Sequence, residues 1–349
     1  MKILYAIQGT GNGHISRARE IIPLLQKRCE TDILISGNQS DMELPFEVKY
    51  RLHGLGFIFG KNGNVDIRET YAKSNIRKLL TEIKELPVKD YDFVLNDFEP
   101  VSAWACYHHK VPCVALSHQS SLRNNNIPKP SHKNVVGKII LKGYAPASLH
   151  IGLHFGRYSK DIYTPVIRRE VREAEVTDKG HYTVYLPSYG NKKLIEILSQ
   201  IPDVQWHVFS KYNKKPQKVN HIKLNPVSNK AFIQSMASSH GILCGAGFET
   251  PSEALFLGKK LLVIPMQHQY EQQYNAAALK AMGVPVLRNL KKGKTVKIKE
   301  WVLSDFKIEI NYPDITEKII SQIFKLYVDG TMQKMNWERI PRKFKIPEL

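Results

Sequence analysis

Cysteine is scarce in this chain of 349 residues, which contains only Cys29, Cys106, Cys113 and Cys244. These residues form no Cys-x-x-Cys pair and no cysteine–histidine spacing typical of zinc sites. That pattern argues against a disulfide scaffold and a structural metal, and it favours reduced thiols in a cytoplasmic protein. We expect Cys29, Cys106 and Cys113 to be small buried apolar side chains.

Long apolar runs are also lacking. No uninterrupted stretch reaches the ~18 apolar residues of a membrane-spanning helix. The apolar run in the N-terminal sequence MKILYAIQGTGNGH is too short for a secretory signal, so we interpret this segment as part of the folded protein. The chain nevertheless has 42% hydrophobic residues, enough for two ordinary cores, which excludes general disorder.

Acidic residues are outnumbered, because 32 Asp and Glu face 51 Lys and Arg, a formal net charge of +19. This excess suggests an anionic partner such as a nucleotide, a phospholipid surface or a nucleic acid. Residues 123–172 and 291–299 are the most basic segments. No arginine-rich arm, zinc finger or aromatic-and-basic RNA motif accompanies them, so nucleic acid is the least favoured partner.

Short apolar runs alternate with amphipathic stretches of helical length, in two series. The first predicts strands at 2–7, 31–37, 92–97 and 112–118, and helices at 14–28, 71–86 and 101–109. The second predicts strands at 181–188, 204–210, 220–227, 241–245 and 260–266, and helices at 192–201, 229–239, 250–258 and 272–283. Such repetition implies parallel sheets in an α/β fold with two tandem doubly wound domains. We expect these domains at 1–160 and 161–330, followed by a tail at 331–349 that packs on the first domain or is loose.

The first predicted strand runs into a glycine-rich turn, residues 8–14 (QGTGNGH). Glycines such as Gly11 and Gly13 let a backbone approach a ligand, and the next helix N-terminus offers free N–H groups. A dinucleotide fingerprint is disfavoured, because its third glycine position is His14 and Ser36, not an acid, ends the second strand. His14 follows the turn at the carboxyl edge of the sheet, where α/β folds bind ligands. It could take a proton from a sugar hydroxyl, or it could only cap the helix.

Other polar side chains are expected at the same sheet edge. Asp97 ends its strand there, as a partner for His14 or as the N-cap of helix 101–109. His118 and Gln119 end the next strand, and His118 is either an acceptor-side or a plain loop histidine. The Asp-x-Asp at residues 90–92 precedes its strand and lies at the opposite edge, so we interpret it as a solvated turn and predict no metal.

The second domain carries a sharper pattern in residues 244–255 (CGAGFETPSEAL). A strand leads through glycines into a helix near Thr250, again an N-terminus open to phosphate. Glu253, one turn further, could accept from two ribose hydroxyls or be an exposed first-turn acid. Residues 265–276 (PMQHQYEQQYNA) are dense in amides, which suit an uncharged hexose.

These motifs resemble those of GT-B glycosyltransferases, in which two Rossmann-like domains face each other across a cleft. The closest likeness is to the bacterial peptidoglycan GlcNAc transferase acting on lipid-linked muramoyl-pentapeptide, and more loosely to the UDP-glucuronosyl and macrolide glucosyl transferases. Residues 9–14 resemble the loop Gly-Gly-Thr-Gly-Gly-His. Residues 246–253 resemble the donor loop Ser-Gly-Ala-Leu-Thr-x-Ser-Glu. Residues 267–276 resemble Gln-His-x-x-x-Gln-Gln-x-x-Asn-Ala.

The resemblance implies a role for each matching position. His14 would be the base, with Asp97 as its partner, beside the loop residues Gly11 and Gly13 and the acceptor-side His118. The donor-binding residues implied are Ser188, Gly190, Gly245, Gly247, Thr250, Glu253, Gln267, His268, Gln272 and Gln273. The chain departs from the family pattern at Gln8, Arg17, Phe248 and Glu249.

We therefore expect an inverting, metal-independent transfer of a hexose-type sugar from a nucleotide diphosphate donor to a hydroxyl acceptor. The expected donor is a UDP-sugar, and no cofactor is expected. The alternatives are a non-hydrolysing sugar-nucleotide epimerase of the same architecture and a non-catalytic nucleotide-sugar-binding protein. The acceptor could be lipid-linked. Residues 133–145 (KNVVGKIILKGYA) combine an apolar helical face with lysines, which suits either peripheral docking on the anionic inner face of a membrane or packing on the core.

Overall fold

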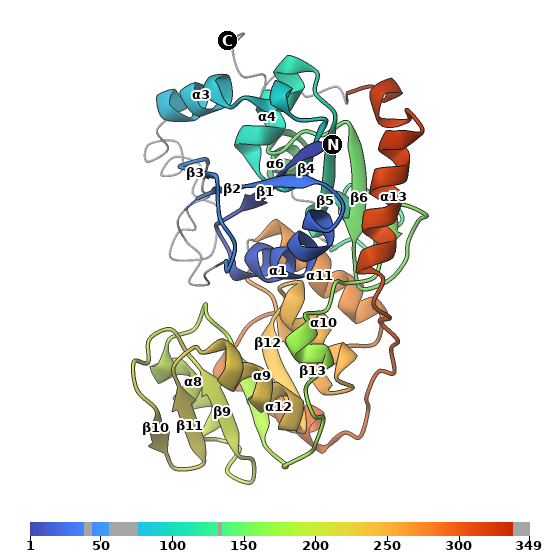
Figure 1. The fold of residues 1–349 in the computed structure, drawn as a ribbon. Helices are drawn as coiled ribbons and strands as arrows, with labels where there is room; N and C mark the ends of the chain where they lie inside the picture. Colours follow the sequence, from blue (N-terminus) through green and yellow to red (C-terminus); the bar gives the residue numbers. More distant parts are fainter. Residues whose placement is uncertain (38–43, 56–75, 132–134, 268, 338–349) are drawn as a thin grey trace.

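The structure is a computed structural model that describes residues 1–37, 44–55, 76–131, 135–267 and 269–337. It contains two α/β domains, one above the other in Figure 1, which confirms the expected fold class. Each domain is built on a sheet of mostly parallel strands with helices on its faces, the arrangement that strand–helix repetition produces.

The N-terminal sheet has seven strands in the order β3-β2-β1-β4-β5-β6-β7, all paired in parallel. Its strands are β1 (Lys2–Gln8), β2 (Glu30–Ser36), β3 (Tyr50–Leu52), β4 (Phe93–Asp97), β5 (Cys113–Ser117), β6 (Leu149–Leu153) and β7 (Ile162–Tyr163). Successive side chains of β1 enter two separate cores: Ile3 and Tyr5 lie in one, and Leu4 and Ala6 in the other. Both faces of the strand are therefore covered, as expected for a parallel sheet.

The C-terminal sheet has six strands in the order β10-β11-β9-β8-β12-β13, parallel except for the edge pair β10–β11. Its strands are β8 (Tyr182–Tyr185), β9 (Trp206–Phe209), β10 (Gln217–Val219), β11 (Ile222–Asn225), β12 (Gly241–Gly245) and β13 (Lys260–Ile264). The structure thus confirms the five strands expected in this half and adds the short edge strand β10.

The helices follow the strands from their carboxyl ends. In the N-terminal half they are α1 (Asn12–Gln26), α3 (Ile76–Glu85), α4 (Pro100–His109), α5 (His118–Ser121), α6 (Val135–Gly143) and α7 (Arg169–Arg172). In the C-terminal half they are α8 (Asn191–Leu198), α9 (Asn229–Ser238), α10 (Glu249–Phe256), α11 (Tyr270–Ala281), α12 (Thr295–Leu303) and α13 (Thr316–Val328). Single 3₁₀ turns lie at η1 (Val88–Asp90), η2 (Lys292–Lys294) and η3 (Met332–Lys334).

The register of the N-terminal sheet decides what meets at its edge. Ile7 of β1 pairs with Asp97 of β4, and Gln8 pairs with Ser36 of β2. The turn after β1 and the end of β4 therefore share one carboxyl edge, as the sequence predicts for parallel neighbours.

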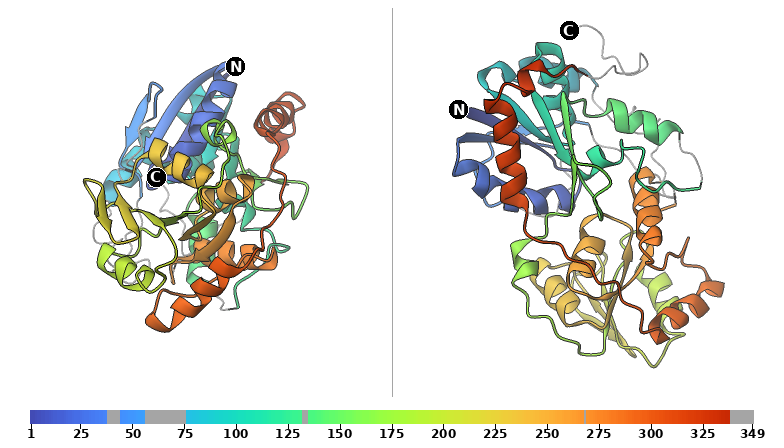
Figure 2. Two further views of the ribbon diagram at one scale, coloured as in Figure 1. Left: turned by 90° about the horizontal axis from the view of Figure 1, so that it is seen from below. Right: turned by 90° about the vertical axis from the view of Figure 1, so that its right-hand side faces the viewer.

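The chain returns to the N-terminal domain through α13, which Figures 1 and 2 place beside that domain. Helix α13 contacts α1, and the Phe324 ring meets Phe93 of β4 edge-on at 6.0 Å. This helix lies within the range 161–330 that we expect to belong to the second domain, and neither α12 nor α13 is predicted from the sequence. The tail at 331–349, expected either to pack on the first domain or to be loose, lies largely outside the described residues. Within the described residues, it is α13 that brings the chain back to the N-terminal domain.

Other local predictions need adjustment. Helix α1 begins at Asn12, two residues earlier than expected, so His14 lies in its first turn and Gly11 is its N-cap. Cys106 and Cys113 are buried as predicted, whereas Cys29 is only half-buried, so that part of the prediction is wrong. The first residues of the helix expected at 71–86 lie outside the described residues.

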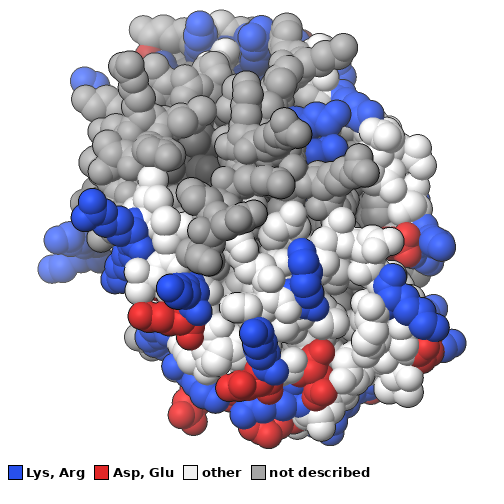
Figure 3. Space-filling view, turned by 90° about the horizontal axis from the view of Figure 1, so that it is seen from above, with Lys and Arg blue, Asp and Glu red and all other residues white. Residues whose placement is uncertain are grey.

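The surface and the helices bear on the expected partners. No helix in the described part of the chain is long and apolar enough to cross a bilayer. On the face in Figure 3, Lys and Arg side chains are scattered among uncharged ones, and acidic side chains gather towards one edge. In α6, Lys138 and Lys142 are exposed while Leu141 is buried and Ile140 packs beside a buried cluster, which fits core packing of this described stretch.

Candidate active site

His14 and Asp97 come together as a pair at the carboxyl edge of the N-terminal sheet. The Nδ1 atom of His14, in the first turn of α1, lies 2.8 Å from Oδ1 of Asp97, the last residue of β4. The histidine side chain is 13% exposed and the aspartate is fully buried. A carboxylate on Nδ1 favours the tautomer that leaves Nε2 free to take a proton. The pair therefore has the arrangement of a base and its orienting partner.

Arg17 is a third member of this group, which the sequence analysis notes only as a departure from the family pattern. Its Nε and Nη2 donate to the two oxygens of Asp97 at 2.9 and 2.8 Å, and Nη2 also lies 3.1 Å from Nδ1 of His14. Arg17 follows His14 by three residues on the same helix, and this spacing places both on one helix face. The helical pattern was the signal that could have found it.

The two charges hold each other ionised. Burial opposes ionisation of Asp97, but the charges of Arg17 and His14 outweigh it and lower the pKa of the carboxyl group. Burial likewise opposes the charge of Arg17, and the carboxylates of Asp97 and Glu249 reverse this and raise its pKa. The group is thus an ionic network in a site from which water is largely excluded.

The alternative role of Asp97, as a helix N-cap, is wrong. Glu99 caps α4, and its carboxylate accepts from the backbone N–H groups of Val101 and Ser102 at 2.7 and 2.6 Å. Asp97 is left free for His14 and Arg17. Burial raises the pKa of Glu99, and these hydrogen bonds oppose the rise.

Glu249 brings the C-terminal domain into the same group. It is the first residue of α10, and its Oε1 accepts from Nη1 of Arg17 at 2.8 Å. A Cβ added to Gly13 would lie 2.5 Å from Oε2 of Glu249, so the carboxylate rests directly on the backbone of the first turn. A side chain at position 13 would therefore have to displace this carboxylate. Two of the four departures from the family pattern, Arg17 and Glu249, are therefore partners across the domain boundary.

Three of the predicted site glycines border open space: Gly11, expected on the acceptor side, and Gly190 and Gly247, expected on the donor side. A Cβ added to Gly11, Gly190 or Gly247 would meet no atom within 4 Å. Gly190 is the N-cap of α8 and Thr250 is the second residue of α10. Ser188 is exposed in the turn before Gly190, and Gly245 is the last residue of β12. The structure thus places the expected diphosphate-facing residues at strand ends and helix starts.

The amides at the start of α11 shape the loop after β13. Gln272 accepts from the backbone N–H of Met266 at 2.9 Å, and Gln273 donates to the carbonyl of the same residue at 2.8 Å. Gln267 is exposed beside them, and His268 lies outside the described residues. Two of the four residues predicted to contact the donor sugar therefore hold this loop in the structure.

Glu253 is neither exposed nor free. Arg168, from the segment joining the domains, donates through Nε and Nη2 to its two oxygens at 2.5 and 2.7 Å. Arg168 also donates to Asn229 at the start of α9. The alternative of an exposed first-turn acid is wrong, because Glu253 is buried. A ribose contact would require Arg168 to share or release the carboxylate.

His118 is part of the joint between the domains and not a loop residue. Its Nδ1 lies 2.8 Å from the carbonyl of Leu153, and its Nε2 lies 2.6 Å from Oδ1 of Asn275 in α11. Its ring stacks on Phe248 at 4.0 Å and 11°. Burial lowers its pKa, and the nearby Glu271 opposes this shift.

The Asp-x-Asp segment has a structural role. Asp92 accepts from the backbone N–H of Lys2 and from the hydroxyl of Tyr327 in α13, both at 2.7 Å. Tyr91 donates to Asp32 at 2.7 Å. Asp92 therefore links β1 to α13 at the edge of the sheet opposite the site. The expectation of a solvated turn is wrong for Tyr91 and Asp92.

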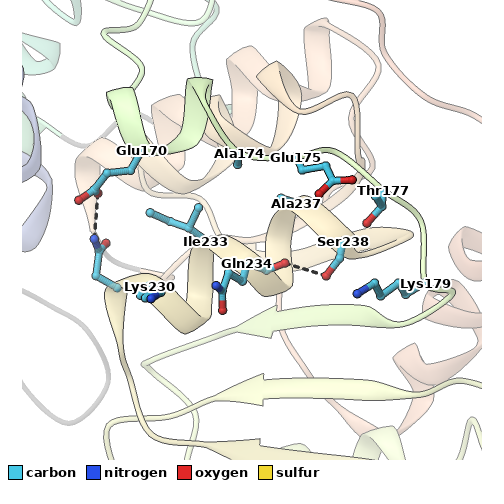
Figure 4. A pocket seen from close by; sticks show the side chains of 11 residues that line it. Glu170, Ala174, Glu175, Thr177, Lys179, Lys230, Ile233, Gln234, Ala237 and Ser238 are labelled. Atoms are coloured by element: carbon cyan, nitrogen blue, oxygen red, sulfur yellow. Dashed lines mark hydrogen bonds between the residues drawn. The ribbon is translucent and has the colours of Figure 1, made fainter.

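A groove of about 890 Å³ lies elsewhere, between α9 and the segment after α7 (Figure 4). Glu170, Glu175, Lys179 and Lys230 line it, and Glu170 accepts from Asn229 at 2.9 Å. Its charges are of both signs, and none of the predicted site residues lines it.

The comparisons with known proteins bear directly on this site. The family model for glycosyl transferase family 1 matches residues 1–304. The chain belongs to this family. It is a glycosyltransferase of the GT-B fold, and sugar transfer from a nucleotide sugar is the activity that the family supports. A search of curated proteins finds no match.

Solved structures agree on the fold of this glycosyltransferase. A Phytolacca americana UGT2 complexed with UDP-2-fluoro-glucose and pterostilbene is 13% identical, with a TM-score of 0.55 over 94% of each chain. The Acinetobacter baumannii MurG is 15% identical, with a TM-score of 0.51 over 96% of this chain and 99% of that one. A UDP-N-acetylglucosamine 2-epimerase is 13% identical, with a TM-score of 0.54 over 96% and 98%.

Proposed function

We propose that this glycosyltransferase transfers a hexose-type sugar from a UDP-linked donor to a hydroxyl acceptor with inversion at the anomeric carbon. The observation that carries the proposal is the His14–Asp97 pair at the carboxyl edge of the N-terminal sheet. Nε2 of His14 takes the proton of the acceptor hydroxyl as its oxygen attacks the anomeric carbon and the diphosphate departs from the opposite face. Asp97 stabilises the imidazolium that forms, and base assistance of this kind contributes about 10²–10⁴-fold.

The C-terminal domain would hold the donor. The open turn at Gly247, the N-terminus of α10 and Thr250 face the side from which a diphosphate would approach. A helix N-terminus stabilises developing negative charge, so this mechanism needs no metal to assist the leaving group. Ser188, Gly190, Gly245 and the loop shaped by Gln272 and Gln273, with Gln267 and His268, would complete the donor subsite, and closure of the domains would exclude water.

The acceptor half supports a lipid-linked hydroxyl as the first acceptor class to test. Helix α6 presents exposed Lys138 and Lys142 on the N-terminal domain, and lysines of this kind attract anionic headgroups. This would place the protein at the inner face of the cytoplasmic membrane as a peripheral protein. Binding to anionic vesicles at low salt supports this placement, and its absence contradicts it.

A panel of nucleotide sugars tests the donor half by thermal shift. A specific ligand at 100 times its dissociation constant stabilises the folded state by about 2.7 kcal/mol, so the true donor raises Tm. If no nucleotide sugar changes Tm, the donor assignment fails.

Turnover of the stabilising donor then tests the base. We expect His14→Ala to lower turnover by about 10²–10⁴-fold while leaving the donor-induced shift in Tm intact, because the donor subsite lies on the other domain. His109→Ala, at the exposed end of α4, is the matched control. Unchanged turnover in His14→Ala contradicts His14 as the base, whereas donor binding without any turnover in the native chain points to a binding protein. Release of an epimerised nucleotide sugar without acceptor identifies an epimerase.

A further inference from the structure

Arg17 presents one edge of its guanidinium to the C-terminal domain. Nε and Nη2 are both directed at Asp97, which fixes the plane of the group in a side chain only 3% exposed. The remaining nitrogen, Nη1, points across the domain boundary and donates to Glu249. Such a buried, pre-oriented N–H edge is suited to binding an oxyanion.

Nη1 of Arg17 already binds an anion, the carboxylate of Glu249 in the C-terminal domain. The Glu249 carboxylate lies between Arg17 and the Gly13 backbone, at the residue where α10 begins. It therefore occupies a position between the base network and the turn that borders open space at Gly247. A diphosphate arriving at this turn would meet the like charge of Glu249.

The carboxylate can leave this position. Glu249 is 29% exposed, so it can turn towards solvent without creating a buried charge. The three atoms nearest to a Cβ added at Gly13 belong to the far end of this flexible side chain, whose carboxylate Arg17 holds through the hydrogen bond from Nη1. Arg17 cannot follow, because Asp97 holds it.

We propose that Arg17 is a direct contact for the donor diphosphate and that Glu249 occupies its place until the donor binds. The inference rests on the proposed function, because it needs a diphosphate donor at α10. Binding exchanges the Glu249 carboxylate for phosphate oxygens on Nη1. The same arginine then joins the leaving group to the Asp97–His14 pair.

Calorimetric titration with UDP and with inorganic diphosphate, at one ionic strength, tests the exchange in the full chain. We expect Glu249→Gln to bind both probes about 5–10-fold more tightly than the native chain, within the usual range of coupling between sites. Glu170→Gln is the matched control, an acid 51% exposed at the neighbouring α7 whose Oε1 lies 3.9 Å from Arg19, and it should bind like the native chain. Arg17→Lys keeps the charge but loses the fork on Asp97, and it should bind both probes more weakly.

The double variant Arg17→Lys with Glu249→Gln separates contact from simple repulsion. If Arg17 is the contact, the gain from Glu249→Gln disappears in the double variant. A gain of equal size in both backgrounds, or no gain in Glu249→Gln, overturns the inference. UDP that binds equally to the native chain and to Glu249→Gln leaves the donor assignment standing and removes only this inference. If inorganic diphosphate binds more tightly to Glu249→Gln and UDP does not bind, the UDP assignment fails while Arg17 stands as the diphosphate contact. If neither probe binds, both the donor assignment and the Arg17 contact fail.

Discussion

Both carboxylate oxygens of Asp97 accept hydrogen bonds from Arg17, one from Nε and one from Nη2. The oxygen bonded to Nη2, Oδ1, also lies 2.8 Å from Nδ1 of His14. The sequence places His14 and Asp97 at one edge, because parallel neighbouring strands end together. It does not reveal that the carboxylate also neutralises a buried arginine. Asp97 therefore compensates a buried charge, and in the proposed mechanism it also orients the base.

This double function predicts different outcomes for the two members of the pair. Asp97→Asn removes the charge that compensates Arg17, and breaking such a buried pair costs about 3–5 kcal/mol. We expect a loss of this order in the free energy of unfolding by urea, together with lower turnover. His14→Ala, at a partly exposed site, should change the unfolding free energy much less. Equal stability of Asp97→Asn and the native chain contradicts the charge-compensation role.

At the scale of elements, the acids that begin α10 and α11 both reach the N-terminal domain. Glu249 accepts a hydrogen bond from Arg17, and Glu271 accepts one from the side-chain amide of Gln119 at 3.0 Å. Acids at helix starts are ordinary in sequence, since they favour the helix dipole. The helices predicted from the sequence begin one residue after each acid, and no sequence pattern identifies the partners of these acids, which belong to the other domain.

The packing of α13 on the N-terminal domain is likewise not identified by any sequence pattern, and it can be tested directly. Phe324 packs edge-on against Phe93, whereas Val328, one turn later, is 81% exposed. We expect Phe324→Ala to lower the free energy of unfolding by about 3–5 kcal/mol, and Val328→Ala to change it by less than about 0.5 kcal/mol. Urea unfolding followed by the signal of the N-terminal domain measures both. Equal effects of the two substitutions contradict the packing of α13 on this domain.

At the scale of the whole molecule, partly buried histidines in both domains predict a loss of stability in mild acid. Burial, with the charge of Arg123, lowers the pKa of His150 to about 3, and burial beside His181 lowers that of His207 to about 4. The unfolded chain has histidine pKa values near 6.5, so it binds more protons than the folded chain between about pH 6.5 and pH 4. The histidine contribution is complete above this range and is lost as pH falls through it.

The contribution is measured as a difference between two proteins. Burial raises the pKa of Glu99 and Glu253, and these groups act in the opposite direction at low pH. The fall in urea midpoint between pH 7 and pH 5 should therefore be larger in the native chain than in His207→Gln. An identical fall in both proteins shows that His207 does not contribute.

The sequence by itself determined the two α/β halves, the glycine turns at strand ends and the shared edge of His14 and Asp97. These follow from periodicity and from the parallel pairing of neighbouring strands, which are properties of short segments. The tertiary structure alone decided that Arg17 meets Glu249, that Arg168 takes both oxygens of Glu253 and that α13 returns to α1. Arg17 and Glu249 are 232 positions apart, and no local pattern encodes a partner at that distance. Their contact depends on how the two domains pack, and that packing brings Arg17, which is bonded to Asp97, next to the N-terminus of α10.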